Sequence, residues 1–294
     1  MKLQQTLERR QHVLDEARLA QRPVAKPDAS PPVIEPIHQA LPTDPVRVRL
    51  WDLPTRIFHW SLVAAVTTAI VTAKVGGSWM SLHGQAGLAI VGLVSFRVVW
   101  GFIGPAHARF ASFWPTPGKL KAYLQGRWQG LGHNPLGAFS VFALLGLLIA
   151  QSTSGLFSND DIDFAGPLAG LVDEGLSGQL TQWHQLLSDG LLILLGLHVA
   201  AIMFYLWFKK DNLVRPMVTG WKDVEPGEPA AIPAVGKPGV RRLPVRVRPI
   251  ALIAALLVAA VAVVLASGVW WPAPAAVALP VAPADQANST APAW

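Results

Sequence analysis

The sequence contains no cysteine among its 294 residues. This absence excludes disulfides, thiolate metal sites, iron–sulfur clusters and the thioether attachment of a c-type haem. Charge is also scarce, because only 14% of the residues are charged, against ~25% in a typical soluble domain. The hydrophobic residues, at 52%, are gathered into long blocks. The composition therefore excludes an ordinary soluble protein and predicts a membrane protein.

Five apolar blocks have the length of a membrane span. They are residues Ile57–Val75, His83–Gly104, Gly137–Phe157, His184–Phe208 and Ile250–Trp271. At ~1.5 Å rise per residue, about 20 residues cross a ~30 Å hydrocarbon core as a helix. Strands of a membrane barrel have ~10 residues and alternate in polarity. We therefore expect an all-α integral membrane protein, with a four-helix transmembrane bundle and one additional C-terminal transmembrane helix.

The segments between these blocks alternate in charge. Residues 105–135 carry four Lys or Arg and no acid, whereas residues 158–182 carry five acids and no Lys or Arg. Because excess Lys and Arg stay on the cytoplasmic side, we expect a multi-pass membrane protein with its N-terminus in the cytoplasm and its C-terminus on the opposite side of the membrane. The net charge of +6 then reflects membrane topology rather than a nucleic-acid partner.

Segments rich in proline and small residues flank the blocks. Residues 1–45 are predicted to be a disordered cytoplasmic arm, since they lack the apolar region of a secretory signal. Residues 46–221 are predicted to form the four-helix membrane domain, 222–249 a Pro/Gly/basic cytoplasmic linker and 272–294 a disordered periplasmic tail. The fifth span, residues 250–271, is therefore expected to be joined through the linker and to stand separate from the first four spans.

Four of the eight histidines lie within or at the edge of the spans: His59, His83, His184 and His198. Ionisable side chains at membrane depth are costly and are functional candidates by default, although a single one often only bonds a neighbouring helix. His184 and His198 are 14 residues apart, so on one helix they differ by about 40° in direction and ~21 Å in height. Span direction then pairs His83 with His184 near the outer face.

The same argument pairs His59 with His198 toward the cytoplasm, with depths that agree to within about two helical turns. Two opposed imidazoles complete a six-coordinate haem iron, so the two pairs predict two haems within the bundle. Small residues on the spans would let a planar macrocycle approach the backbone, although ordinary close packing of membrane helices explains them as well. These residues are Gly84, Gly87, Gly92, Gly146, Gly190 and Gly196.

Arg97 stands 14 residues from His83, on nearly the same face and ~21 Å deeper. A buried Arg needs an anion, which a haem propionate would supply; the alternative is that its side chain extends to the inner headgroups. Arg56 and Lys74, at the two ends of the first span, are weaker candidates for the same role. His133, like the other histidine of the basic segment, His107, is interpreted as a solvated surface residue.

These residues lie in motifs that resemble the bacterial cytochrome b561 family, including nickel-hydrogenase-type cytochrome b subunits. The motifs are Val48-Arg49-Leu50-Trp51-Asp52-Leu53-Pro54-Thr55-Arg56-Ile57-Phe58-His59-Trp60, His83-Gly84-Gln85-Ala86-Gly87 followed by Arg97 and Trp100, Gly132-His133-Asn134-Pro135-Leu136-Gly137, and His184 with His198. The resemblance covers residues 46–221 and implies a four-helix core holding two haem b groups. It implies that the four span histidines are the axial ligands, and that the first-span histidine pairs with the later histidine of the fourth span.

The resemblance also implies electron transfer between a quinone pool and a redox partner protein, which could be a hydrogenase, a dehydrogenase or a cytochrome c. The leading hypothesis is thus a lipid-embedded electron-transfer cytochrome rather than a self-contained enzyme. Two alternatives stay open. One is a stand-alone quinol oxidoreductase, and the other is a haem-free membrane transporter whose His and Arg side chains move protons or bind a metal.

Overall fold

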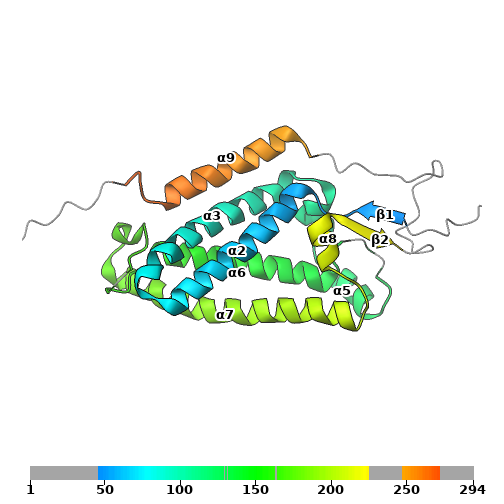
Figure 1. Ribbon diagram of the computed structural model, residues 1–294, viewed down its shortest axis with the longest axis horizontal. Helices are drawn as coiled ribbons and strands as arrows, with labels where there is room; N and C mark the ends of the chain where they lie inside the picture. Colours follow the sequence, from blue (N-terminus) through cyan, green and yellow to red (C-terminus); the bar gives the residue numbers. More distant parts are fainter. Residues whose placement is uncertain (1–45, 129, 131, 163, 225–246, 272–294) are drawn as a thin grey trace, which may run out of the picture. The chain divides into compact units, whose positions relative to one another are not determined.

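The computed structural model describes residues 46–128, 130, 132–162, 164–224 and 247–271. Five helices in these ranges are long and apolar enough to cross a membrane (Figure 1): α2 (Leu53–Val75), α3 (Met80–Ile103), α6 (Pro135–Leu156), α7 (Glu174–Trp207) and α9 (Pro249–Ala266). The predicted all-α membrane architecture is confirmed. The predicted arm, the predicted tail and most of the predicted linker lie outside the described residues.

Capping side chains determine where three of the spans begin. Asp52, Asn134 and Asp173 precede α2, α6 and α7, and each accepts a hydrogen bond from the amide three residues later, at 2.9, 2.7 and 2.9 Å. Such caps satisfy amides that have no partner in the first turn. α7 therefore begins ten residues before the predicted start at His184. The polar residues of its first turns lower the hydropathy but do not break the helix.

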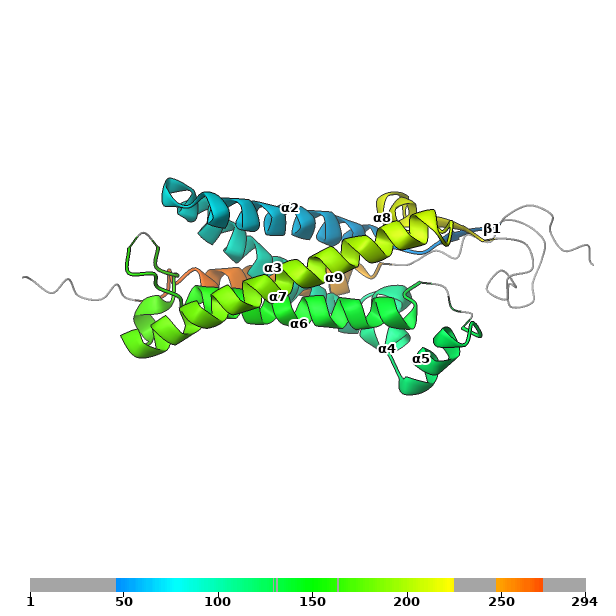
Figure 2. The ribbon, with the colours of Figure 1, turned by 90° about the horizontal axis from the view of Figure 1, so that it is seen from below.

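The remaining elements are short, and they lie at the ends of the long helices. They are η1 (Gly77–Trp79), η2 (Ala106–Ala108), α4 (Phe110–Phe113), α5 (Pro117–Leu124), η3 (Ala169–Leu171) and α8 (Val214–Thr219). Figure 2 shows α4 and α5 at the end of the bundle where α6 begins. The four basic residues of the 105–135 segment therefore gather at this end, and the acidic segment before α7 lies at the other.

Two strands join the entry of α2 to the exit of α8. β1 (Val46–Arg49) pairs antiparallel with β2 (Trp221–Val224), with Arg49 opposite Trp221. The Leu50 amide continues the pairing by donating to the Gly220 carbonyl at 2.8 Å. The strand pair was not predicted, and it takes residues 222–224 out of the predicted linker.

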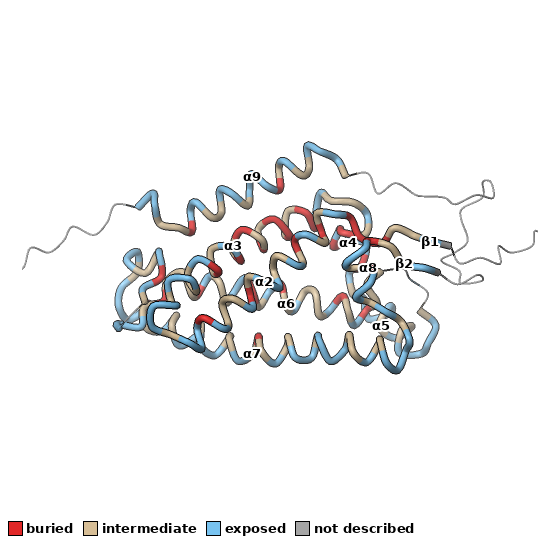
Figure 3. The backbone as a smooth tube through the Cα atoms, in the orientation of Figure 1, coloured by how far each residue is buried: buried red, intermediate tan, exposed pale blue. Residues whose placement is uncertain are grey.

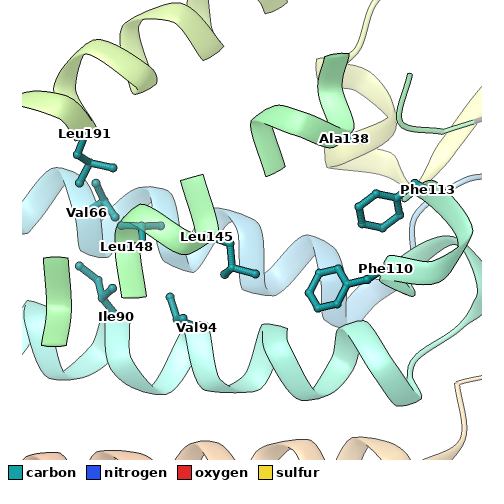
Figure 4. Close-up of a cluster of buried hydrophobic side chains, with 9 residues drawn as sticks. All are labelled: Val66, Ile90, Val94, Phe110, Phe113, Ala138, Leu145, Leu148 and Leu191. Carbon is teal, nitrogen blue, oxygen red and sulfur yellow. The ribbon is translucent and has the colours of Figure 1, made fainter. Parts of the chain in front are cut away.

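A buried apolar cluster holds the four central helices together. Figure 4 shows its members, which are Val66, Ile90, Val94, Phe110, Phe113, Ala138, Leu145, Leu148 and Leu191. Figure 3 shows that burial concentrates on α3, whereas the outward faces of α7 and α9 are exposed. Large exposed side chains on those faces, such as Ile193 and Leu256, are apolar, and this suits contact with lipid.

α9 packs along α3 instead of standing apart, so the prediction of a separate fifth span is wrong (Figure 1). Ala255 is fully buried in a cluster with Phe96 and Trp100 of α3. A Cβ added at Gly92 would lie 2.7 Å from Val263 Cγ2, so only glycine permits this close approach. For Gly92 the sequence left two explanations open, room for a cofactor and close packing of helices, and the α3–α9 contact supports the second.

Candidate functional site

His83 of α3 and His184 of α7 face each other across the bundle. Their ring centroids are 6.1 Å apart, and the ring planes are nearly perpendicular, at 87°. Two imidazoles are too few for a zinc site, which takes three or four protein ligands. They suit an iron that a porphyrin already holds. With metal–nitrogen bonds of about 2 Å on each side, the centroids of two axial imidazoles lie roughly 6 Å apart.

Hydrogen bonds define which nitrogen of each ring is free for a metal. His83 Nδ1 donates to the Ala69 carbonyl at 2.9 Å, and His184 Nδ1 donates to the Gln151 carbonyl at 2.9 Å. Because a carbonyl oxygen only accepts, both protons are on Nδ1 and the lone pair is on Nε2. The Gln151 side-chain amide donates to His184 Nε2 at 3.1 Å. This arrangement is typical of a metal-ligating histidine, whose second nitrogen is held by a carbonyl group.

A cavity of about 390 Å³ surrounds this pair. Side chains from α2, α3, α6 and α7 line it, together with the segment that joins α6 to α7. Two glycines shape it. A Cβ at Gly155 would lie 2.7 Å from His184 Cε1, whereas a Cβ at Gly87 would meet nothing within 4 Å. Gly155 thus makes room for the imidazole, and Gly87 leaves the cavity wall open. The cavity and the opposed rings fit a haem.

His59 of α2 and His198 of α7 form the second predicted pair. They lie close enough for their charges to interact. Ser140 Oγ lies 3.4 Å from His198 Nδ1. His59 Nδ1 is buried and has no hydrogen-bond partner among the described residues. A buried polar atom without a partner is costly, so this histidine retains coordination or hydrogen-bonding capacity at the inner position.

Arg97 is buried in protein, with 5% of its surface exposed, which argues against extension to the headgroups. Its guanidinium lies over the Phe110 ring, 4.7 Å from the centroid, and Asp52 attracts it electrostatically. Within the part of the chain that the structure describes, Arg97 Nη1 has no hydrogen-bond partner. Arg56 is placed differently, because its Nη1 donates to the Val218 carbonyl of α8 at 2.6 Å.

The comparisons with known proteins agree with this geometry. Residues 50–220 match the model of the family described as prokaryotic cytochrome b561. The chain belongs to this family. A probable Ni/Fe-hydrogenase B-type cytochrome subunit of Azotobacter vinelandii is 24% identical over 213 residues, which are 60% of this chain and 88% of that protein. No solved structure matches the chain.

Membership of the cytochrome b561 family indicates membrane electron transfer with haem b as the cofactor. The matched range contains all four span histidines and Arg97. It ends before α9, which therefore lies outside the part of the chain that carries the family resemblance.

His133 is half-buried and not solvated as interpreted from the sequence, and its Nδ1 is buried. Its ring packs between Trp51 and Phe113, at centroid distances of 4.7 and 4.5 Å. Burial, and to a smaller extent the positive charge of Arg97 and the nearby His198, lower the pKa of His133 to about 3. The sequence places His133 in a basic loop, and its burial depends on Trp51, which is distant in the chain. No local pattern reveals that contact.

Proposed function

We propose that the chain is a di-haem b-type cytochrome that transfers electrons across the bacterial inner membrane between a redox partner protein and the quinone pool. The observation that carries this proposal is the opposed pair of His83 and His184, with both Nδ1 protons bonded to backbone carbonyls. Bound haem would supply a one-electron iron couple, tuned by its axial ligands and surroundings.

At the outer position, His83 and His184 would hold the haem iron. The carbonyls of Ala69 and Gln151 hold the rings in orientation and raise the basicity of the ligating nitrogens. The Gln151 amide, which donates to His184 Nε2, would yield that nitrogen to the metal. Lys74 lines the same cavity and supplies a cation for a carboxylate of the bound group.

At the inner position, His59 and His198 would hold the haem iron. Arg97 would bind a carboxylate of the bound group through Nη1, and Arg56 is a second cation at this end. The two ligands on α7 are separated by ~21 Å of helix, so the two sites together span most of the hydrocarbon core. This separation gives electrons a route from one face of the membrane to the other.

The charge distribution supports the proposed orientation. The basic segment with α4 and α5 would be cytoplasmic, and the acidic segment before α7 periplasmic. The partner would be a hydrogenase-type enzyme, because the Azotobacter vinelandii relative is named as a hydrogenase cytochrome subunit. The other possible partners are a dehydrogenase and a cytochrome c. The protein that co-purifies with the chain from membranes would show which of the three is the partner.

The purified chain should show the intense Soret band of haem b, and quinol added to proteoliposomes should reduce it. A protein without a Soret band would favour the transporter alternative. Haem that quinol does not reduce, in a preparation whose partner reduces it, would remove the quinone from the proposal. Stoichiometric oxidation of quinol by the chain alone, with a soluble acceptor, would favour the stand-alone oxidoreductase.

A further inference from the structure

His133 combines a fixed position with an unused polar atom. Trp51 and Phe113 hold its ring between them. Its Nδ1 is buried and, among the residues that the structure describes, has no hydrogen-bond partner. A donor or acceptor that is buried without a partner destabilises the fold. If the ring served only to pack against Trp51 and Phe113, burial of this nitrogen would bring no benefit.

The position of His133 relates it to the inner site. Phe113, which packs against the His133 ring, also contacts Phe110, and the Arg97 guanidinium lies over the Phe110 ring, 4.7 Å from its centroid. The other surroundings of His133 include a second cavity, of about 430 Å³, which His107 and Lys119 also line. His133 therefore lines this cavity and is linked through Phe113 and Phe110 to Arg97 of the inner site.

Arg97 and His133 share a further property. Arg97 Nη1 is also buried without a hydrogen-bond partner in the described part of the chain. Both nitrogens are buried and have unused hydrogen-bonding capacity, and their side chains interact electrostatically. Such a pair suits an anion with two acceptor oxygens. A carboxylate is such an anion, and haem b carries two of them.

We propose that His133 is a positioning residue of the inner haem, whose ring N–H donates to a haem carboxylate that Arg97 also binds. This inference rests on the proposed di-haem function. A neutral imidazole suits the position, because a second full positive charge beside Arg97 would be costly in a buried site. Burial and the positive charge of Arg97 both lower the pKa of His133, which favours the neutral ring.

The consequence concerns the redox potential of one haem. A carboxylate near an iron stabilises the oxidised state, and a hydrogen bond to that carboxylate weakens this effect. Removal of the donor should therefore lower the midpoint potential of the inner haem. It should also speed release of that haem at least about tenfold, as expected for the loss of a hydrogen bond to a charged group.

The test uses the full-length holoprotein with three variants. His133→Phe keeps the aromatic packing and removes the donor, whereas His133→Asn restores an N–H near the position of Nδ1. His107→Asn is the matched control, since His107 belongs to the same basic segment and lines the same second cavity. Each variant is titrated potentiometrically, and haem transfer to a haem-free acceptor protein is timed. The outer haem serves as the internal control for folding.

We expect a lower midpoint for one haem in His133→Phe, wild-type values for both haems in His107→Asn, and recovery in His133→Asn. Unchanged midpoints and release rates in His133→Phe would overturn the inference, as would equal shifts of both haems. Failure of His133→Asn to recover would show that an N–H at this position does not set the potential of the inner haem, which also overturns it. A wild-type protein with a single haem would instead overturn the proposed function, because His133 would then have no inner haem to position.

Discussion

Gly155→Ala is the substitution whose effect follows most directly from the geometry of the outer site. The new Cβ would lie 2.7 Å from His184 Cε1 and 2.9 Å from His184 Nδ1. Carbon atoms do not approach so closely, so the imidazole must move away from the Gln151 carbonyl, to which it donates at 2.9 Å. The substitution therefore acts on the orientation of the ligand and leaves its chemistry unchanged.

The magnitude differs between the haem-free and haem-loaded protein. Without haem the ring can turn aside, so the cost is one hydrogen bond, about 0.5–1.5 kcal/mol. The higher helix propensity of Ala over Gly stabilises the helix by ~1 kcal/mol, so the free energy of unfolding of the haem-free protein is nearly unchanged. With haem the ring is fixed, and an overpacking cost of about 1–3 kcal/mol remains. Because the haem-free protein has already lost about 1 kcal/mol with the hydrogen bond, the difference is up to about 2 kcal/mol, and we expect up to roughly 30-fold weaker binding of the outer haem.

The assay is haem occupancy and haem release in Gly155→Ala, compared with Gly146→Ala. Gly146 lies on the same helix, and a Cβ there meets nothing within 4 Å. The control should gain ~1 kcal/mol of stability and retain both haems. If Gly155→Ala held the outer haem as tightly as the control does, His184 would not be the ligand, or its ring would not depend on Gly155 for its position.

Three further perturbations test other parts of the account. Arg97→Gln should lower the midpoint potential or the occupancy of the inner haem, and unchanged midpoints and stoichiometry would show that Arg97 binds no haem carboxylate. Truncation after Val224 should leave both haems in place but lower the thermal stability, because it exposes the α3 surface around Phe96 that α9 covers; loss of either haem would show that α9 closes the site. A reporter fused after Trp294 should be active only in the periplasm, and cytoplasmic activity would reverse the proposed orientation.

The parts of the fold that the sequence predicted are those that local composition controls. Five apolar blocks predicted five long helices, since burial of the backbone in lipid leaves little alternative to a helix. The pairing of His83 with His184 followed from helical rise and span direction, and the structure brings those two rings together. The second pairing, of His59 with His198, stays a prediction, supported by their electrostatic proximity.

The parts that the sequence did not predict depend on contacts between distant residues. α7 starts early because the Asp173 cap stabilises its first turn, although the residues of that turn are too polar for the hydropathy pattern to include them. The α3–α9 contact depends on Gly92 meeting Val263, and neither block shows its partner in its own sequence. The burial of His133 likewise depends on Trp51, more than 80 residues earlier in the chain. In each case the hydropathy of a segment depends on its own residues, and it does not reveal which distant segment packs against them.

The central claim is that the bundle holds two haems, each between one histidine of α7 and one of another helix. Haem per polypeptide, counted in purified variants, tests it most directly. The wild-type chain should bind two haems, and His83→Ala combined with His184→Ala should retain one, because two ligands of one iron act as a unit. The crossed variant, His83→Ala with His198→Ala, should retain none. A crossed variant that still held one haem, beside an 83/184 double variant that held none, would contradict the pairing on which the account depends.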